Sequence, residues 1–315
     1  MELGEIRKMF EIRTDLAVET SEKRPDGKEI SGLLVEKEKR GEDITITKVR
    51  IETQKAAKTM GKPRGTYISI EADQMMEEDS DYHREISEIF SEQLKNFLPK
   101  QYQKKKILVI GLGNREVTPD ALGPKVIDQL FITRHLLEEF GKYMVELEEC
   151  CSISGIVPGV MAQTGMETVE ILQGVVAQTK PDIVIAVDAL AARSIKRLNR
   201  TIQITDTGII PGSGVGNYRN AITREHLGIP VIAVGIPTVV DAATIVADFC
   251  TGLMENKQEL EEMGETVRGM IPPKLNAMYV TSKDIDEAVN RLSYTISEAI
   301  HKAVFSGKNR KQDNC

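Results

Sequence analysis

The chain has 315 residues, of which 41% are hydrophobic and 28% are charged, and its formal net charge is −7. This composition is typical of a soluble globular protein, and the negative charge argues against a general binder of nucleic acid or anionic membranes. No apolar run approaches the roughly 20 residues that span a bilayer, and the N-terminus lacks the apolar core of a secretion signal.

The cysteines favour a reducing cytoplasm. Cys150 and Cys151 are adjacent, Cys250 and Cys315 stand alone, and no C-x-x-C spacing occurs. Zinc sites and disulfide frameworks need a more regular spacing than this. We therefore expect a cytoplasmic protein without a cysteine-bound metal site or a disulfide framework.

The N-terminal third predicts strands followed by a helix. Residues 1–15 are mostly polar, and residues 13–19 place an acidic residue directly before an apolar one; the sequence predicts an extended arm here, with a plain edge strand as the alternative. Segments 44–52 and 65–71 are rich in β-branched residues, which predicts two antiparallel strands. The apolar spacing over residues 80–98 predicts an amphipathic helix capped by Ser80.

The stretch 107–124 is the centre of the predicted fold. Residues 107–110 form a short unbroken apolar run of the kind found in parallel sheets that are covered on both faces. Gly111 and Gly113 let the backbone turn sharply where this strand ends, and Asp120 follows. Open α/β sheets place their ligands at this edge, so we expect the chemistry of the protein here.

The rest of the chain alternates between helices and apolar strands. A Gly/Ser/Pro loop is predicted at 152–165, and a capping box at Thr281 and Asp284 predicts the start of the last helix. The other helices are predicted at 126–141, at 166–177 and beyond 241, and the strands at 183–187, 202–205 and 231–234. This alternation predicts a three-layer, mostly parallel α/β sheet.

Two of these strands run out into acidic residues. Asp188 follows Val187 directly, and Asp120 follows Ile110 through a turn. Parallel strands end at one edge, so we expect the two carboxyl groups to converge and to share a proton. One could then activate a water while the other protonates a leaving amine. The alternative is that each aspartate caps the helix after it, a position that Asp favours.

Several other motifs suggest different chemistry. Asp206-Thr207-Gly208 matches the triplet of pepsin-like proteases, but those are all-β and combine two triplets, so we interpret this one as a turn. Ser213 is not in a G-x-S-x-G elbow, and no histidine lies in the glycine-rich loops at the strand ends, which weakens a nucleophilic mechanism. His226, in a loop of its own, is a candidate for contact with substrate.

The glycine-rich loops leave a binding function open. GLGN at 111–114 and GSGVGN at 212–217 could cradle a phosphate through backbone N–H groups, as in a nucleotide-binding module. The third glycine of G-x-G-x-x-G is replaced by Glu116, so the dinucleotide fingerprint is weak.

Six motifs together resemble the germination protease family of spore-forming bacteria. They extend over nearly the whole chain: RTDLAVE, GLGN with TPDALGP, SGIVPGVMAQTGMET, PDIVIAVDALAAR, TDTGIIPGSGVGN and GIPTVVDA. The set is far more specific than any one glycine loop.

The resemblance implies an autoprocessing endopeptidase of an atypical aspartic type, made as a zymogen, that cleaves small acid-soluble spore proteins during germination. The aspartates of the family fall on Asp120 and Asp188, and its processing bond falls on Asp15–Leu16. The resemblance also implies a homotetramer in the cytoplasm of the forespore and spore core. Neither a cofactor nor direct contact with nucleic acid or a membrane is expected.

The resemblance further implies a fold similar to the hydrogenase-maturation peptidases, so a metal-dependent peptidase is the second enzyme hypothesis. We expect a propeptide at 1–15, an N-terminal β-rich lobe with its helix at 16–100, an α/β peptidase domain at 101–307 and a polar tail at 308–315. Six residues are candidates for lining the site: Asn114, Asp206, Gly212, Ser213, His226 and Asp241.

Overall fold

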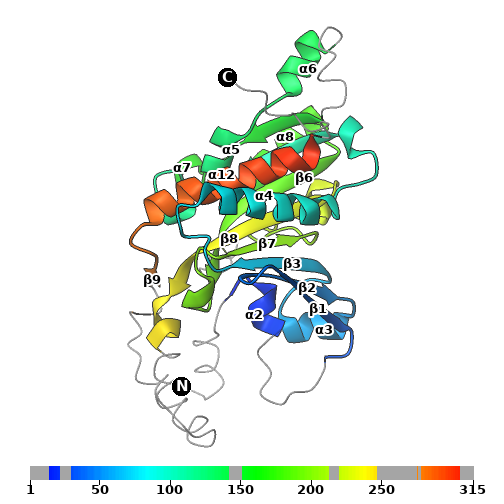
Figure 1. Cartoon of the computed structure of the whole chain (residues 1–315). Coiled ribbons are helices and arrows are strands. Elements are labelled where there is room, and N and C mark those ends of the chain that lie inside the picture. The colour runs from blue at the N-terminus through cyan, green and yellow to red at the C-terminus, as the bar shows by residue number, and fades with distance from the viewer. Residues whose placement is uncertain are drawn as a thin grey trace, which may run out of the picture.

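A computed structural model describes residues 14–21, 30–141, 151–212, 220–246, 275 and 278–305, and these ranges contain one nine-stranded sheet. Its strand order is β1-β2-β3-β7-β8-β6-β4-β5, and β9 pairs with β8 (Figure 1). The strands are β1 Leu33–Arg40, β2 Ile44–Ile51, β3 Gly65–Ala72, β4 Lys106–Gly111, β5 Ser152–Ile156, β6 Ile183–Ala192, β7 Thr201–Thr205, β8 Val231–Asp241 and β9 Tyr279–Val280.

The two halves of the sheet differ in strand direction. Strands β5, β4, β6 and β8 are parallel, whereas β1, β2, β3 and β7 are antiparallel to their neighbours, including β8. The prediction of a mostly parallel sheet therefore holds for the first half only. Residues 193–200 alone separate β6 from β7. This link is too short for the crossover that joins parallel strands, so β7 returns antiparallel.

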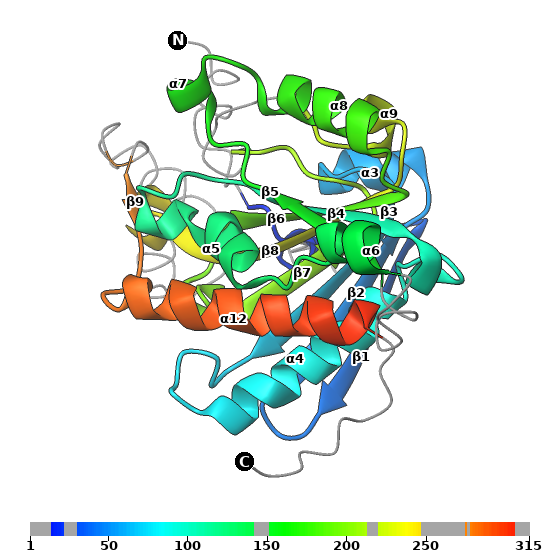
Figure 2. The same ribbon diagram turned by 90° about the horizontal axis from the view of Figure 1, so that it is seen from above.

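Helices cover both faces of the sheet (Figure 2). The pair α4 and α12 lies on one face, and α8, α9 and α3 lie on the other. The helices described are α2 Ala17–Ser21, α3 Gln54–Met60, α4 Ser80–Lys95, α5 Leu122–Gln129, α6 Arg134–Phe140, α7 Met161–Thr164, α8 Thr168–Thr179, α9 Arg224–Leu227 and α12 Ile285–Val304. Within the described ranges, no helix has both the length and the apolar character that a bilayer crossing requires.

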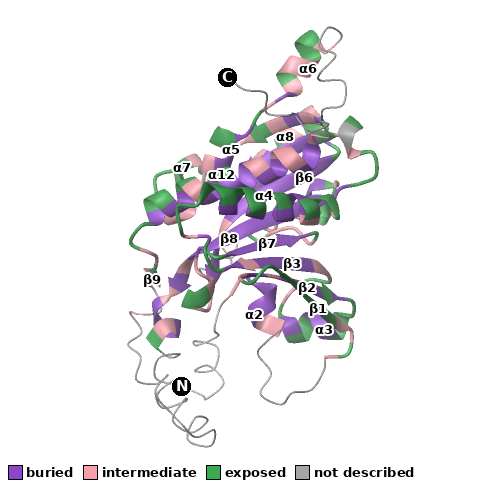
Figure 3. Ribbon diagram, viewed as in Figure 1, coloured by how far each residue is buried: buried purple, intermediate pink, exposed green. Residues whose placement is uncertain are grey.

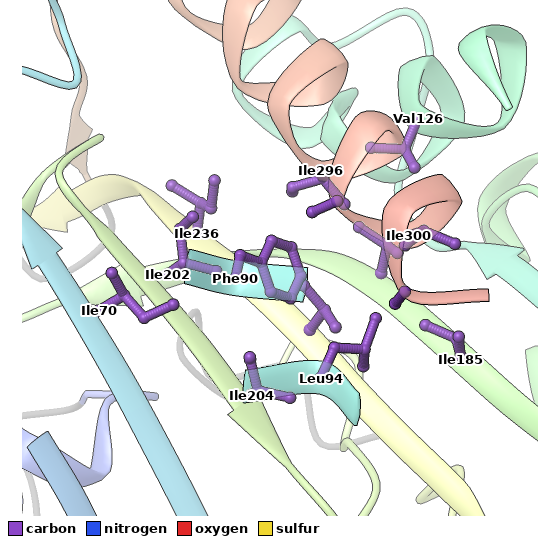
Figure 4. Packing of buried hydrophobic residues seen from close by; sticks show 14 of the residues in the cluster. Ile70, Phe90, Leu94, Val126, Ile185, Ile202, Ile204, Ile236, Ile296 and Ile300 are labelled. Atoms are coloured by element: carbon purple, nitrogen blue, oxygen red, sulfur yellow. The ribbon is translucent and has the colours of Figure 1, made fainter. Parts of the chain in front are cut away.

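The largest apolar cluster lies between the sheet and the pair α4 and α12 (Figures 3 and 4). Phe90 and Leu94 of α4 and Ile296 and Ile300 of α12 are fully buried there. They pack with strand residues that include Ile185, Ile202, Ile204 and Ile236. Burying one such side chain contributes about 1.5–3 kcal/mol, so this cluster fixes the sheet on which the site is built.

Two predicted helix caps are wrong. The N-cap of α4 is Asp79 rather than Ser80, because the Asp79 carboxylate accepts hydrogen bonds from the N–H groups of Asp81 and Tyr82. The capping box before α12 does not form, since the Thr281 hydroxyl donates to the Thr238 carbonyl oxygen of β8 instead. Local hydrogen bonds select Asp79 in the first case, and a tertiary contact with β8 engages Thr281 in the second.

Three predicted segments differ from the structure. The helix expected over 126–141 is split into α5 and α6, because the backbone becomes extended at Leu130. Before α6, the Thr133 N–H donates to Ile153 of β5, and its hydroxyl donates to Cys151 just before that strand. The loop expected at 152–165 begins with β5, which pairs in parallel with β4. The expected arm beyond Asp15 is not an edge strand but enters helix α2. Residues 1–13 and the tail from 306 onward lie outside the described ranges.

Candidate active site

A cavity of about 390 Å³ opens at the carboxyl ends of the parallel strands. The loop after β4 lines it with Gly113 and Asp120, strand β6 lines it with Asp188, and strand β8 lines it with Thr238. Asp15, from the N-terminal segment, completes one wall. This is the edge at which α/β sheets bind their ligands, and both predicted acidic residues border the same space.

Asp188 lies inside β6 rather than beyond its end. The strand continues to Ala192, and Asp188 is in register with Gly235 of β8, so no helix follows for it to cap. Its side chain is only 5% exposed, and one carboxylate oxygen accepts the N–H of Ala189 at 2.9 Å. The capping alternative is therefore wrong for Asp188, which is held instead as a buried acidic group in the cavity.

The Asp188 carboxyl group is strongly biased toward its protonated form. Burial raises the pKa of Asp188 well above its usual range, and the negative charges of Asp120 and Asp15 raise it further. The hydrogen bond from Ala189 opposes these effects. Because burial penalises the charged carboxylate and both neighbours repel it, Asp188 is placed to hold a proton and to donate it.

Asp120 is fixed by the loop that follows β4. It ends a 3₁₀ turn, and one of its carboxylate oxygens accepts the N–H of Asn114 at 2.7 Å. Helix α5 starts after Ala121 without a side-chain cap, so the capping alternative is wrong here too. Burial raises the pKa of Asp120, and the Asn114 hydrogen bond lowers it. The site thus contains two interacting carboxyl groups whose pKa values are both raised.

The loop can close on Asp120 because Gly113 has no side chain. Gly113 has φ +109°, and a Cβ atom there would lie 2.0 Å from the Asp120 carbonyl oxygen. Any other residue would clash with the backbone and adopt an unfavourable conformation. The hydroxyl of Thr238 further ties this turn to β8 by donating to the Pro119 carbonyl oxygen at 2.6 Å.

The N-terminal segment enters the cavity beside strand β6. The Asp15 N–H donates to the Ala191 carbonyl oxygen at 3.0 Å, and the Ala191 N–H donates to the Asp15 carboxylate at 2.9 Å. Leu16 is fully buried in a small apolar cluster with Val18, Leu190 and other residues of β6 and β8. The predicted processing bond is thus seated against the strand that carries Asp188.

Glu19 anchors the same segment. Its carboxylate accepts the N–H groups of Arg193 at 2.8 Å and Ser194 at 2.9 Å, and the Arg197 guanidinium lies 3.7 Å away. The Thr14 hydroxyl also donates to this carboxylate. A buried carboxylate with this many donors is well compensated, so the segment is held on both sides of the Asp15–Leu16 bond.

Two of the six candidate lining residues reach the site. Gly212 lines the cavity, and Asn114 contributes its backbone N–H to Asp120. Ser213 lies outside the described residues. The side chains of the other three bond to residues outside the cavity lining: Asp206 to the Thr66 N–H, His226 to the Thr223 hydroxyl and Asp241 to the Thr244 N–H.

The structure bears on two other hypotheses for the site, a metal-dependent peptidase and a phosphate-binding glycine loop. In the part of the chain that the structure describes, no three His, Cys, Asp or Glu side chains gather as a metal site would require. In the GLGN loop, the Leu112 N–H donates to Val187 and the Asn114 N–H donates to Asp120. These amides are therefore already engaged within the protein rather than directed at a phosphate.

Two site residues escaped the sequence reasoning. Lys62 and Gln203 both donate to the carbonyl oxygen of Asp15, yet they are 47 and 188 residues away from it. Lys62 lies in a Gly/Pro-containing link, and Gln203 follows the alternation of an ordinary strand. The one usable signal was Gln203, a polar residue between two buried isoleucines in the middle of the sheet.

The sheet and the cavity define the class: an α/β protein with a buried pair of acidic residues at the carboxyl ends of its parallel strands. The germination protease family matches residues 10–277 of the chain. Germination proteases of Caldanaerobacter subterraneus subsp. tengcongensis (43% identical, 96% of this chain and 97% of that protein), Clostridium perfringens (39%, 94% and 96%) and Bacillus mycoides (45%, 84% and 72%) are similar to it. The chain belongs to the germination protease family and is thus a protease of spore germination.

Proposed function

We propose that this chain is an autoprocessing endopeptidase of the atypical aspartic type, which cleaves small acid-soluble spore proteins in the spore core. The observation that carries the proposal is that Asp15, Asp120 and Asp188 line one cavity. Membership of the germination protease family supports the substrate class and the spore location. The proposed function therefore rests on the family assignment and on two acidic residues that share a cavity with Asp15 of the same chain.

The chemistry divides between the two acidic groups. The ionised member takes a proton from a water molecule, whose oxygen bonds to the carbonyl carbon of the scissile peptide. The C–N bond then breaks as the protonated member gives its proton to the amine nitrogen. The environment favours Asp188 as the protonated member, because it is the more deeply buried of the two and is repelled by both neighbouring carboxylates.

The N-terminal segment is proposed to be a propeptide of residues 1–15. Asp15 is an acidic residue followed by the buried apolar Leu16. Its N–H donates to the Ala191 carbonyl oxygen of β6, and its carboxylate accepts the Ala191 N–H. Cleavage between these residues would release the propeptide and leave Leu16 as the new N-terminus. The mature enzyme is proposed to act as a homotetramer, which light scattering of the purified protein would test.

The proposal is tested with Asp188→Asn in the full-length chain. The substitution keeps the size of the side chain and an acceptor for the Ala189 N–H, but removes the proton donor. We expect wild-type protein to yield Leu16 as its N-terminus by mass spectrometry, while the variant folds and retains residues 1–15.

Asp206→Asn is the matched control, since Asp206 hydrogen bonds to the Thr66 N–H outside the cavity lining. It should process as the wild type does. An N-terminus at Leu16 in the Asp188→Asn protein would overturn the proposed role. Loss of wild-type processing after chelation of metal ions would favour the metal-dependent hypothesis instead.

A further inference from the structure

Two side chains from distant parts of the chain hold the backbone carbonyl group of Asp15. Gln203 Nε2 and Lys62 Nζ each lie 3.0 Å from its oxygen. This oxygen belongs to the Asp15–Leu16 peptide, the bond that the proposed function has the enzyme cut. Both donors are therefore directed at the atom that gains negative charge when this bond is hydrolysed.

The Gln203 amide contacts the scissile peptide with one end and the next peptide group, Leu16–Ala17, with the other. Its Nε2 donates to Asp15, and its Oε1 accepts the N–H of Ala17 at 2.7 Å. The side chain is 6% exposed, on strand β7, which pairs with β3 on one side and β8 on the other. Because β7 is held on both edges, Gln203 presents its donor from a rigid position.

Lys62 is positioned by the end of helix α3. Gly61 ends this helix in the left-handed conformation at φ 62°, and the Lys62 N–H returns to the Ala57 carbonyl oxygen at 3.2 Å. The Lys62 side chain then lies over the N-terminal segment. Burial lowers the pKa of Lys62, while the carboxylates of Asp15 and Glu19 raise it and favour the charged ammonium.

Asp15 lies between the two acidic residues of the cavity and the two hydrogen-bond donors. Asp15 lines the same cavity as Asp120 and Asp188, and its charge acts on Asp188. The donors reach Asp15 from β7 and from the link after α3, which are elements of the antiparallel half of the sheet. The peptide bond that the donors hold therefore borders the space in which the two acids would activate water.

We propose that Lys62 and Gln203 form the oxyanion site of this peptidase, both for its own Asp15–Leu16 bond and for the equivalent bond of a protein substrate. This inference rests on the proposed function. As the water oxygen bonds to the carbonyl carbon, the C=O electron pair moves onto the oxygen, where the two N–H groups stabilise it. The pair returns when the C–N bond breaks, so Asp120 and Asp188 need only move protons between the water and the amine.

The experiment compares full-length variants in the release of residues 1–15. Lys62→Met removes the ammonium group and keeps the aliphatic stem, and Gln203→Leu removes the amide. Lys58→Met is the matched control, since it makes the same change at an exposed position of helix α3, just before Lys62. We expect a loss of about 100-fold or more for each donor variant, as for other oxyanion donors, and a rate near wild type for Lys58→Met.

A second measurement separates catalysis from anchoring. Backbone hydrogen exchange over residues 16–19 should stay as slow in Lys62→Met as in the wild type, because Glu19 and the Leu16 cluster still hold the segment. Lys62→Arg, which keeps a cationic donor, should recover part of the rate. Fast exchange that accompanies the lost rate would show that Lys62 only anchors the segment, and would overturn the inference.

Asp188→Asn in the same assay separates a failure of the proposed function from a failure of the oxyanion inference. Processing by that variant would end the proposed function, whatever Lys62 does. A block in Asp188→Asn together with wild-type rates in Lys62→Met and Gln203→Leu would end the oxyanion inference alone. Should Lys62→Met fail to fold, Gln203→Glu decides: it keeps the acceptor for Ala17, sets a negative charge beside the oxygen and is expected to block cleavage.

Discussion

The parallel and antiparallel halves of the sheet supply different kinds of groups to the surroundings of Asp15. The parallel half, β5-β4-β6-β8, carries Asp120 and Asp188, two buried acids with raised pKa values. The antiparallel half contributes Lys62 and Gln203, which donate hydrogen bonds to the peptide. Among the described residues, no cation lowers the pKa of Asp120 or Asp188, because Lys62 lies at the Asp15 peptide. The two acids therefore favour a protonated state.

The largest expected effect is the loss of either acid. Asp120→Asn keeps an acceptor for the Asn114 N–H, so the loop should fold, but it removes the carboxyl group that we propose exchanges protons with water. We expect release of residues 1–15 to slow by about 100-fold to 10,000-fold, the usual range for a general acid or base. Mass spectrometry over time measures this rate.

Asp128→Asn is a matched control for this variant, because Asp128 lies eight residues further on and pairs with the exposed Arg115. It should leave the rate unchanged. If Asp120→Asn processed normally while Asp188→Asn did not, the parallel half would supply a single acid, and the idea of a pair would be abandoned.

A smaller effect is expected from pH, through the raised pKa of Asp188. Donation to the leaving amine requires protonated Asp188, so self-cleavage should accelerate as the pH falls from about 8 to about 5. The change should reach about tenfold per pH unit where the pair titrates. A rate that stays constant across this range would contradict the assignment of Asp188 as the acid.

The same pKa shift predicts how stability depends on pH. The folded protein binds this proton more tightly than the unfolded chain, in which an aspartate has a pKa of about 3.9. The stability that Asp188 contributes is therefore complete below the unfolded pKa and is lost as the pH rises through the folded pKa. Melting temperatures of the wild type should fall over that window, and Asp188→Asn should flatten the curve.

The smallest expected effect tests how the antiparallel half positions Lys62. Gly61 and Gly41 both have left-handed φ angles, 62° and 69°, and a Cβ at either would meet no atom within 4 Å. Alanine at either position should destabilise the fold by about 1 kcal/mol through backbone strain alone. Because Gly61 precedes Lys62 and Gly41 lies in the β1–β2 turn, only Gly61→Ala should also slow self-cleavage.

Local patterns were enough to predict most of the strands. The apolar run at 107–110 and the β-branched segments at 44–52 and 65–71 form β4, β2 and β3 as expected, because burial and strand propensity act over a few neighbouring residues. The same patterns identified Asp120 and Asp188 as acids that follow apolar strands. They did not establish that Asp188 lies within its strand, since that depends on the pairing of β6 with β8.

The sequence by itself thus determined the family, most of the strands and the two acids, all of which depend on short contiguous motifs. Only the tertiary structure decided that half of the sheet is antiparallel and that Lys62 and Gln203 reach one carbonyl oxygen at Asp15. The physical reason is distance along the chain: a hydrogen bond between residues 47 or 188 positions apart leaves no local pattern. Such bonds form only after the packed core has brought the strands together.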